Sequence, residues 1–460
     1  MLACLGVHAM DVDSEGGGEL KPFDMLEDGL VLAIMRSLDD PVPLYIASLV
    51  CRRFAKLCTE SFIWKPLLHA ELPPASRGIF SWPPCANDRW RERYKQWHTL
   101  SHLTWVHCPP ALGSAQPCPR FLHRAAAVGG SMYVHGGRGA ESELGDMWVI
   151  RADAVAASGA ASWERVTPKS EYEPIARLSA TLSAVTLSGP SHYGLLMFGG
   201  RCGERFLNDV WLFDTHDATW AMLHAHSPQP SASCKRPDGR WAHSAVTHGS
   251  TEVIVFGGSA PGRCFNDIFS LSMPTHQWVE HECVGTRPPP RSGHSVCVVQ
   301  GSMYVFGGNT TKESFNDLWS YHVDTRAWTQ VRTKVHAAPA LRAAAAAAPR
   351  GHRAHDIRMF VHAPPQASPS ARVGHALIPF GNRLMLFGGR KFSENTFDSA
   401  LHCFDLQARR WSELAVGGLQ PRVRTGHAAI PCNGGFLVFG GLSSVRDEYF
   451  NDVFMLRLFG

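Results

Sequence analysis

The sequence predicts a small all-α module followed by an all-β propeller of six four-stranded blades. Two observations predict the propeller: a Gly-Gly doublet recurs six times after short apolar runs, and a tryptophan follows most of these doublets at a similar distance. A third observation predicts the helical module, because residues 25–67 carry an apolar stripe at helical spacing.

Composition limits the class of protein. Of the 460 residues, 45% are apolar and 18% charged, which is typical of a globular chain with a real core. The net charge of +4 is small and the basic residues are dispersed, so we expect no nucleic-acid partner. Neither a long apolar run nor a basic leader is present, so we expect no membrane partner and a cytoplasmic and/or nuclear location. The 13 cysteines are scattered without a C-x-x-C pair, which predicts reduced thiols and no metal site.

The glycine doublets define the blades. Glycine at these positions allows positive φ, so the chain can turn sharply beside a neighbouring strand. Downstream of each doublet, Asn-Asp or a variant begins the next strand, where its side chains are expected to cap the loop. The doublets are Gly136-Gly137, Gly199-Gly200, Gly257-Gly258, Gly307-Gly308, Gly388-Gly389 and Gly440-Gly441.

The tryptophans predict how the ring closes. Trp163, Trp220, Trp278, Trp328 and Trp411 each begin the outermost strand of a unit. The last unit has no such residue, whereas a spare match, Thr104-Trp105-Val106, precedes the first unit. We therefore predict that this N-terminal strand completes the final blade, which leaves no exposed sheet edge between first and last blade.

These repeats, with spacings near ~50 residues, resemble a kelch propeller over residues 103–460. Within that range, residues 333–370 contain an alanine run, prolines and basic residues, which predicts a low-complexity loop between blades four and five.

The N-terminal module begins after a segment, residues 1–22, that is predicted to be disordered. Leu26, Leu30, Ile34 and Leu38 lie on one face of a helix that Pro41 ends. Shorter apolar stretches follow, and a linker at residues 68–102 contains a charged helix. A module of this size, residues 23–67, cannot bury its own apolar surface and should need a partner.

This module resembles an F-box. The resemblance implies docking onto a Skp-type adaptor and through it onto a cullin-RING ubiquitin ligase. One departure is Glu27, where the family usually has proline after the first leucine. The order of the modules is similar to that of Zeitlupe-type proteins, but the segment before residue 23 is too short for their flavin-binding LOV domain, so no cofactor is expected. The residues that the resemblance assigns to the adaptor are Leu26, Leu30, Ile34, Leu38, Pro41, Leu44, Val50, Cys51, Phe54 and Trp64.

An arginine precedes the innermost strand of every unit, and a histidine follows three residues later in all units but the second, which has Ala180. Six arginines at a channel mouth could form a positive rim for an acidic or phosphorylated peptide. The alternative is that they hold the blade architecture, as we expect for the histidines. The six blade arginines are Arg120, Arg177, Arg240, Arg291, Arg372 and Arg424, and the histidines are His123, His243, His294, His375 and His427.

Unrepeated loop residues after the doublets offer a second explanation of substrate choice, because binding residues concentrate on loops. They are Arg138, Glu141, Arg201, Glu204, Arg205, Arg263, Lys312, Glu313, Arg390, Lys391, Arg446 and Glu448.

The predicted function is that of a substrate-recognition subunit of a Skp/cullin/F-box ubiquitin ligase, which has no catalytic residues and binds an unidentified target protein. Two alternatives remain. One is a scaffold that acts outside ubiquitination, which Glu27 favours. The other is a kelch-fold oxidase, which we rank low because the chain lacks an evident copper-binding Tyr and His cluster.

Overall fold

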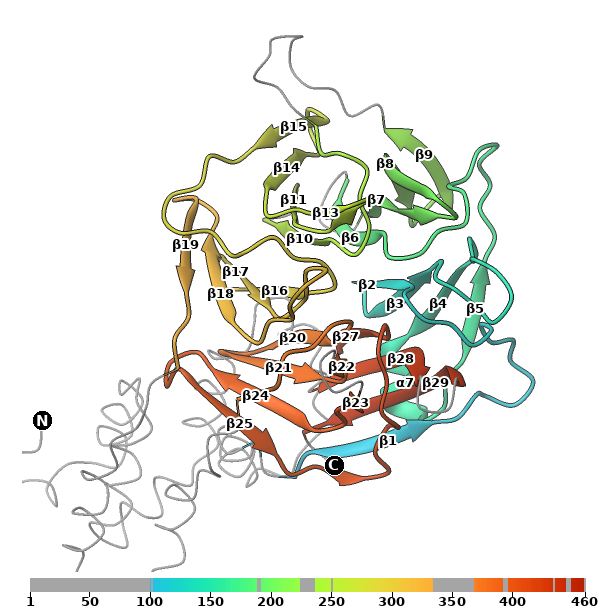
Figure 1. Ribbon diagram of the computed structural model, residues 1–460. Coiled ribbons are helices and arrows are strands. Elements are labelled where there is room, and N and C mark those ends of the chain that lie inside the picture. Colours follow the sequence, from blue (N-terminus) through green and yellow to red (C-terminus); the bar gives the residue numbers. More distant parts are fainter. Residues whose placement is uncertain are drawn as a thin grey trace, which may run out of the picture. The chain divides into compact units, whose positions relative to one another are not determined.

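The computed structural model describes residues 100, 102–187, 192–223, 236–249, 251–333, 368–391, 396–432, 435–443 and 448–458. These residues form a propeller of six sheets, five with four antiparallel strands and one with five strands, so the predicted propeller is confirmed (Figure 1). The predicted module at residues 23–67 and the linker helix lie outside the described residues, as does most of the 333–370 loop. Among the described helices, none has the length and apolarity that a bilayer crossing needs.

Each of the first three blades runs in chain order from its innermost to its outermost strand. Blade 1 consists of β2 (Arg124–Val128), β3 (Ser131–His135), β4 (Met147–Arg151) and β5 (Trp163–Val166). Blade 2 consists of β6 (Thr181–Thr186), β7 (Tyr193–Cys202), β8 (Arg205–Asp214) and β9 (Thr219–Leu223). Blade 3 consists of β10 (Ser244–His248), β11 (Glu252–Phe256), β14 (Ile268–Ser272) and β15 (Gln277–Glu280).

Blades 4 and 5 repeat this order, and blade 6 differs in its outer strand. Blade 4 consists of β16 (Ser295–Val299), β17 (Ser302–Phe306), β18 (Leu318–His322) and β19 (Ala327–Gln330). Blade 5 consists of β20 (Ala376–Phe380), β21 (Arg383–Phe387), β24 (Leu401–Asp405) and β25 (Arg410–Leu414). Blade 6 consists of β27 (Ala428–Cys432), β28 (Gly435–Ser443), β29 (Glu448–Arg457) and then β1 (Thr104–Cys108).

Strand β1 closes the ring, as the sequence predicts. It pairs antiparallel with β29 along its whole length, from Thr104 opposite Arg457 to Cys108 opposite Val453. The short β26 (Gly417–Gly418) adds a parallel strand on its other side (Figure 1). The Trp105 side chain is only 2% exposed, because its ring packs against Phe436 of the same blade and Phe387 of blade 5. The first strand of the ring is therefore built into its last sheet.

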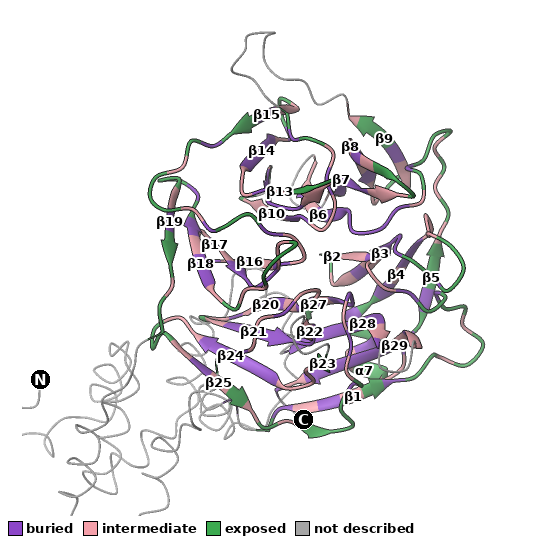
Figure 2. Cartoon of the chain, in the orientation of Figure 1, coloured by how far each residue is buried: buried purple, intermediate pink, exposed green. Residues whose placement is uncertain are grey.

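One aromatic contact recurs at every junction between blades. The tryptophan of each outermost strand packs against the residue that precedes the glycine doublet of the blade before it, with ring centroids 4.7–5.7 Å apart. Figure 2 shows the buried residues running along the strands, with exposed positions on outer strands such as β15 and β19. The pairs are Trp163–Phe439, Trp220–His135, Trp278–Phe198, Trp328–Phe256, Trp411–Phe306 and Trp105–Phe387.

Close contacts require both glycines of a doublet, the first at the junction with the next blade and the second within its own blade. Gly440 has a φ of +65°, and a Cβ atom there would lie 2.8 Å from the ring of His123 on blade 1. Its neighbour Gly441 has a φ of +107°, and a Cβ atom there would lie 3.0 Å from the Cβ of His427 on its own blade. Any side chain at either position would therefore clash as well as strain the backbone.

The structure also contains elements that the sequence did not predict. Helix α7 (Ala152–Ser158) is inserted between β4 and β5, and Arg457 of blade 6 donates a hydrogen bond to its Ala156 carbonyl at 2.7 Å. Two small hairpins lie between the second and third strands of blades 3 and 5. They are β12 (Ser259–Ala260) with β13 (Arg263–Cys264) and β22 (Arg390–Lys391) with β23 (Thr396–Phe397).

We predict that Trp105→Ala lowers the free energy of unfolding by about 3 to 5 kcal/mol, because it removes a fully buried indole from the closing strand. Denaturant unfolding followed by tryptophan fluorescence and circular dichroism measures the change. The control is Met222→Ala, which truncates an apolar side chain that is 47% exposed on outer strand β9 and should cost about 0.5 kcal/mol. Equal stability of the two variants would contradict closure through β1.

Candidate functional site

The six blade arginines lie in the protein interior. Each is at most 1% exposed, and they are among the largest fully buried side chains in the described part of the chain. Each donates from Nη1 to the carbonyl of the first glycine of its own doublet, as Arg120 does to Gly136 at 3.2 Å. They therefore hold the turn that follows the second strand of the blade.

Each blade arginine also pairs with an aspartate of its own blade. Arg120 makes two parallel hydrogen bonds to the Asp146 carboxylate, at 2.7 and 2.8 Å, and Trp148 Nε1 donates to the same carboxylate at 2.6 Å. Four other blades repeat this bidentate geometry, whereas Arg372 makes one bond to Asp398, at 2.8 Å. The four repeats are Arg177–Asp209, Arg240–Asp267, Arg291–Asp317 and Arg424–Asp452.

The interpretation of these arginines as an exposed positive rim is therefore wrong. A guanidinium that is buried and already paired with a carboxylate has neither the access nor the free charge to bind a second anion. The aspartates are those of the Asn-Asp motif, which sequence reasoning assigned only to loop capping. The recurrence of one Arg and one Asp in every repeat was the signal that could have revealed the pairing.

In four of the six pairs the pKa of the aspartate is lowered. Burial raises the pKa of Asp146, but the hydrogen bond and charge of Arg120 outweigh it, so that the pKa lies below its usual value. The same balance lowers the pKa of Asp209 and Asp317. In Asp398, hydrogen bonds from His402 and the Ala400 N–H oppose the effect of burial and again lower the pKa.

A cavity of about 630 Å³ occupies the centre of the ring. Its wall is built from the innermost strands and from two sets of loops, those that precede the innermost strands and those between second and third strands. Leu122 and Thr425 represent the first set, and Cys264 and Thr311 the second. The cavity therefore lies on the face of the propeller that carries both sets of loops, which we call the loop face.

The five repeated histidines line this cavity but are engaged in the junctions between blades. His243 Nε2 lies 3.2 Å from the hydroxyl of Thr181 on blade 2, and His294 Nε2 lies 2.8 Å from the hydroxyl of Ser244 on blade 3. Burial, with the positive charge of nearby arginines, lowers the pKa of both imidazoles well below the usual value. They are neutral structural groups at physiological pH.

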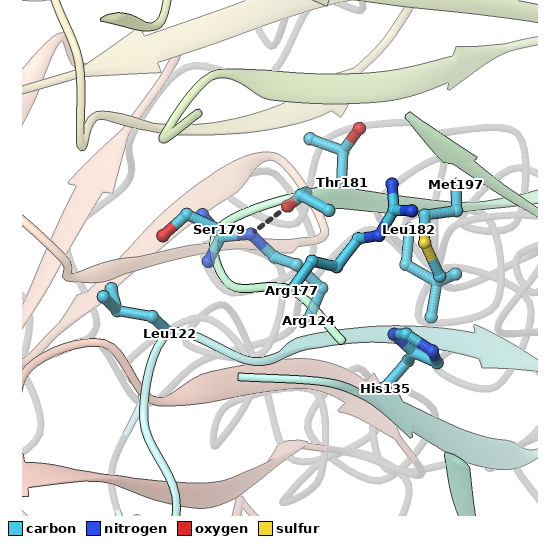
Figure 3. A pocket seen from close by; sticks show the side chains of 9 residues that line it. Leu122, Arg124, His135, Arg177, Ser179, Thr181, Leu182 and Met197 are labelled. Atoms are coloured by element: carbon cyan, nitrogen blue, oxygen red, sulfur yellow. Dashed lines mark hydrogen bonds between the residues drawn. The ribbon is translucent and has the colours of Figure 1, made fainter. Parts of the chain in front are cut away.

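One position in the cavity wall departs from the repeat. The residue after the histidine is small in the other blades, but in blade 1 it is Arg124, and the histidine position that it faces on blade 2 is Ala180. Arg124 Nε donates to the Ala180 carbonyl at 2.8 Å (Figure 3). Among the described residues that line the cavity, Arg124 is the one arginine, and no lysine, aspartate or glutamate lines it. Sequence reasoning noted Ala180 but missed Arg124.

The unrepeated loop residues that were predicted to select a substrate do not line the cavity, as far as the described part of the chain shows. Several contact other loop residues instead: Arg263 pairs with Asp238 at 2.8 Å, and Arg201 stacks on Trp241 at 4.9 Å. Arg446 lies outside the described residues. In the same described part, no cluster of three or more His, Cys, Asp or Glu side chains is arranged to hold a metal ion.

We predict that Arg291→Met destabilises the propeller by about 3 to 5 kcal/mol, because it leaves the Asp317 carboxylate without its buried partner. The matched control is Arg263→Met, which breaks an ion pair whose side chains are 60% and 64% exposed and should cost about 1 kcal/mol at most. Denaturant unfolding compares the two. A stable Arg291→Met protein that no longer binds its target would restore the rim interpretation.

We predict that the free energy of unfolding falls as the pH is lowered from 7.5 to 5.5. Burial keeps the pKa of His135, His375 and His427 at about 3, whereas in the unfolded chain it is near ~6.5. The unfolded chain therefore binds protons that the folded chain does not, at a cost of about 1 kcal/mol per histidine at pH 5.5.

Below about pH 4, Asp146, Asp209 and Asp317 add a second loss, because their folded pKa values are lowered and their stabilisation disappears on protonation. Unfolding curves at several pH values measure both effects. The control His216→Gln changes an exposed ring and should keep the same pH profile. A profile that is flat between pH 7.5 and 5.5 would contradict the burial of neutral histidines.

The chain is similar in sequence to several known proteins, among them other kelch proteins. Kelch domain-containing protein 3 of Homo sapiens is 28% identical over 267 residues, which are 56% of this chain and 63% of that protein. Acyl-CoA-binding domain-containing protein 4 of Arabidopsis thaliana is 31% identical over 194 residues, 41% of this chain and 27% of that protein. Adagio-like protein 1 of rice is 26% identical over 430 residues, 91% of this chain and 62% of that protein. The chain thus spans less than two thirds of the length of each.

A family model gives the most direct assignment. The model of the KLHDC2/KLHL20/DRC7 Kelch-repeats domain matches residues 87–235, 229–363 and 358–459, which together cover the propeller and none of residues 23–67. The kelch propeller of this chain is a protein-interaction domain. With six blades, a closing N-terminal strand and this match over most of its length, the chain belongs to the KLHDC2/KLHL20/DRC7 Kelch-repeats domain family.

Proposed function

We propose that this chain is the substrate-recognition subunit of a Skp/cullin/F-box ubiquitin ligase, in which the propeller binds the target protein and residues 23–67 bind the adaptor. The proposal joins the protein-interaction domain described above to the F-box resemblance of the N-terminal segment. The chain itself would perform no chemistry.

The observation that carries the proposal is the cavity on the loop face. Its volume, about 630 Å³, falls within the range of pockets that bind small ligands or a short stretch of peptide. Its wall offers serine and threonine hydroxyls, an asparagine amide, a tryptophan ring and one guanidinium, a mixture suited to peptide groups and side chains. The sealed ring holds these groups on strands and short loops, so little order has to be gained on binding.

The segment before the propeller also takes part in a sequence similarity to a known protein. The alignment with rice Adagio-like protein 1 covers 91% of this chain, which is more than the propeller can supply. The aligned span must therefore include residues that precede Thr104.

The expected contribution to ubiquitination is proximity. A target held by the propeller on the same chain as an adaptor-binding module is present at a high effective concentration near the ubiquitin-conjugating enzyme. Since this effect needs both attachments at once, loss of either should abolish it without changing the other.

We predict that Leu30→Asp combined with Ile34→Asp abolishes capture of the Skp-type adaptor and cullin, because two carboxylates would be buried in an apolar contact. The experiment is a pulldown of the full chain followed by immunoblotting for both partners. The matched control is Leu112→Asp combined with Leu419→Asp, which makes the same change at side chains that are 106% and 65% exposed on the propeller, and it should bind normally.

The same pulldown separates the alternatives. Capture of a target protein without adaptor or cullin by the unaltered chain would support a scaffold that acts outside ubiquitination. Adaptor capture that survives the double substitution at Leu30 and Ile34 would refute the assignment of this helix to the adaptor.

A further inference from the structure

Six backbone hydrogen bonds form a closed ring around the central cavity. In each blade, the N–H of the residue two positions after the blade arginine donates to the carbonyl of the equivalent residue of the preceding blade, at 2.7–3.1 Å. Each of these residues therefore donates once and accepts once within the ring, and all six line the cavity. We call this ring the collar. Its residues are Leu122, Ser179, Ala242, Gly293, Gly374 and Gly426.

The collar holds its backbone in the left-handed region. The φ angle lies between +51° and +65° at all six residues. Glycine adopts this conformation freely, whereas a side chain makes it unfavourable. Blades 4, 5 and 6 have glycine at this position, but blades 1, 2 and 3 have Leu122, Ser179 and Ala242. Three blades thus keep a side chain where it strains the backbone, and such strain is commonly found at ligand-binding positions.

Leu122 has the largest side chain of the collar. It is only partly buried, and it lines the cavity at the end of the loop that leads into β2 (Figure 3). Its Cδ2 atom lies 3.1 Å from the point that a Cβ atom would occupy at Gly426, so the side chain extends along the collar towards blade 6. Because a partly exposed side chain adds little to the core, burial does not account for the strain that Leu122 introduces.

The wall of the cavity offers apolar groups and little charge. Trp241 comes from a loop at the mouth, and Leu182 comes from the inner strand β6. Lysine, aspartate and glutamate do not line the cavity in the described part of the chain, and its one arginine, Arg124, is hydrogen-bonded to the backbone of blade 2. An apolar side chain of a ligand would be buried against leucine and indole groups here. The lining therefore suits an uncharged, apolar side chain at the collar.

We propose that Leu122 is a specificity-determining residue of the central cavity and contacts a large apolar side chain, such as leucine or phenylalanine, of the bound protein segment. This inference rests on the proposed binding of a target by the propeller, but not on the adaptor. Glycine at position 122 would fit the backbone of the collar better, so the leucine is retained for its contact with the ligand. Removal of this side chain should therefore weaken binding without weakening the fold.

The first measurement is the thermal unfolding midpoint of the full chain. Leu122→Gly relieves the strained φ, so its midpoint should rise or stay within about 2 °C of that of the unaltered chain. The matched control is Leu182→Gly, which makes the same change at a residue of β6 that lines the same cavity and is 8% exposed. It should lower the midpoint by about 5 °C or more, because a buried side chain is lost. An equal loss in Leu122→Gly would mean that Leu122 serves the fold and would overturn the inference.

The second measurement is the binding of fluorescein-labelled hexapeptide amides to the full chain, followed by anisotropy. Five positions are randomised among glycine, alanine, serine and glutamine, and the third position is fixed as leucine, phenylalanine or alanine. The three mixtures share their label and net charge, so they differ only in the fixed side chain. The unaltered chain should bind the leucine or the phenylalanine mixture about tenfold or more tightly than the alanine mixture, because the larger side chain is buried.

Three variants then assign the preference to Leu122. Leu122→Gly should reduce it to about threefold or less, because the apolar contact is lost. Leu122→Met keeps a large apolar side chain and should keep the preference. Ala242→Gly introduces glycine at a second collar residue, where φ is +51°, and should keep the preference as well.

A preference that survives in Leu122→Gly would overturn the inference, as would the absence of a preference in the unaltered chain. If the unaltered chain binds all mixtures equally, target binding by the propeller stands and only the role of Leu122 fails. Adaptor capture on the same samples tests the ligase assignment separately, so the two failures can be told apart.

Discussion

The structure depends on a buried ion pair that is repeated in every blade. The arginine lies before the innermost strand, and its guanidinium bonds both a carbonyl of the glycine doublet and the aspartate at the start of the third strand. Three segments of one blade are thereby held together by one side chain. Because all six pairs hold the loops of the same face, they determine where the cavity wall lies. The neutral histidines and the tryptophan contacts then fasten each blade to the next. The buried arginine–aspartate pairs lie within blades, whereas aromatic packing and hydrogen bonds connect each blade to the next.

This division explains which parts of the fold the sequence could predict. Strand positions, blade number and closure by Trp105 follow from repeated residues whose effect is local or is satisfied in the same way at each repeat. Helix α7 could not be foreseen, since its seven residues occur in one blade and have no counterpart in the repeat. The two small hairpins between second and third strands are equally unrepeated and contain only two residues per strand.

The candidate site was predicted less well, for a physical reason. A repeated arginine was open to two interpretations, as a ligand-binding cation or as one half of an internal pair, and its burial depends on how the chain folds. The repeat of Asp146 and its equivalents favoured the internal pair, but only the observed 2.7 Å contact decides it. The useful sequence signal was the opposite one, the loss of repetition at Arg124 and Ala180. In a ring of similar blades, residues shared by all repeats mostly maintain the fold. A residue that departs from the repeat is therefore the better candidate for a ligand contact.

The pairing of β1 with β29 has a practical consequence for anyone who divides this chain. A fragment chosen to begin at Arg120, where the first repeat starts, would contain every glycine doublet and still lack the outermost strand of blade 6. In its final sheet, β29 would still pair with β28 but would expose its other edge. The free backbone amides and carbonyls of that edge could pair with a second copy of the fragment. Counting repeats therefore places the beginning of the domain too late, and a soluble fragment has to start before Thr104.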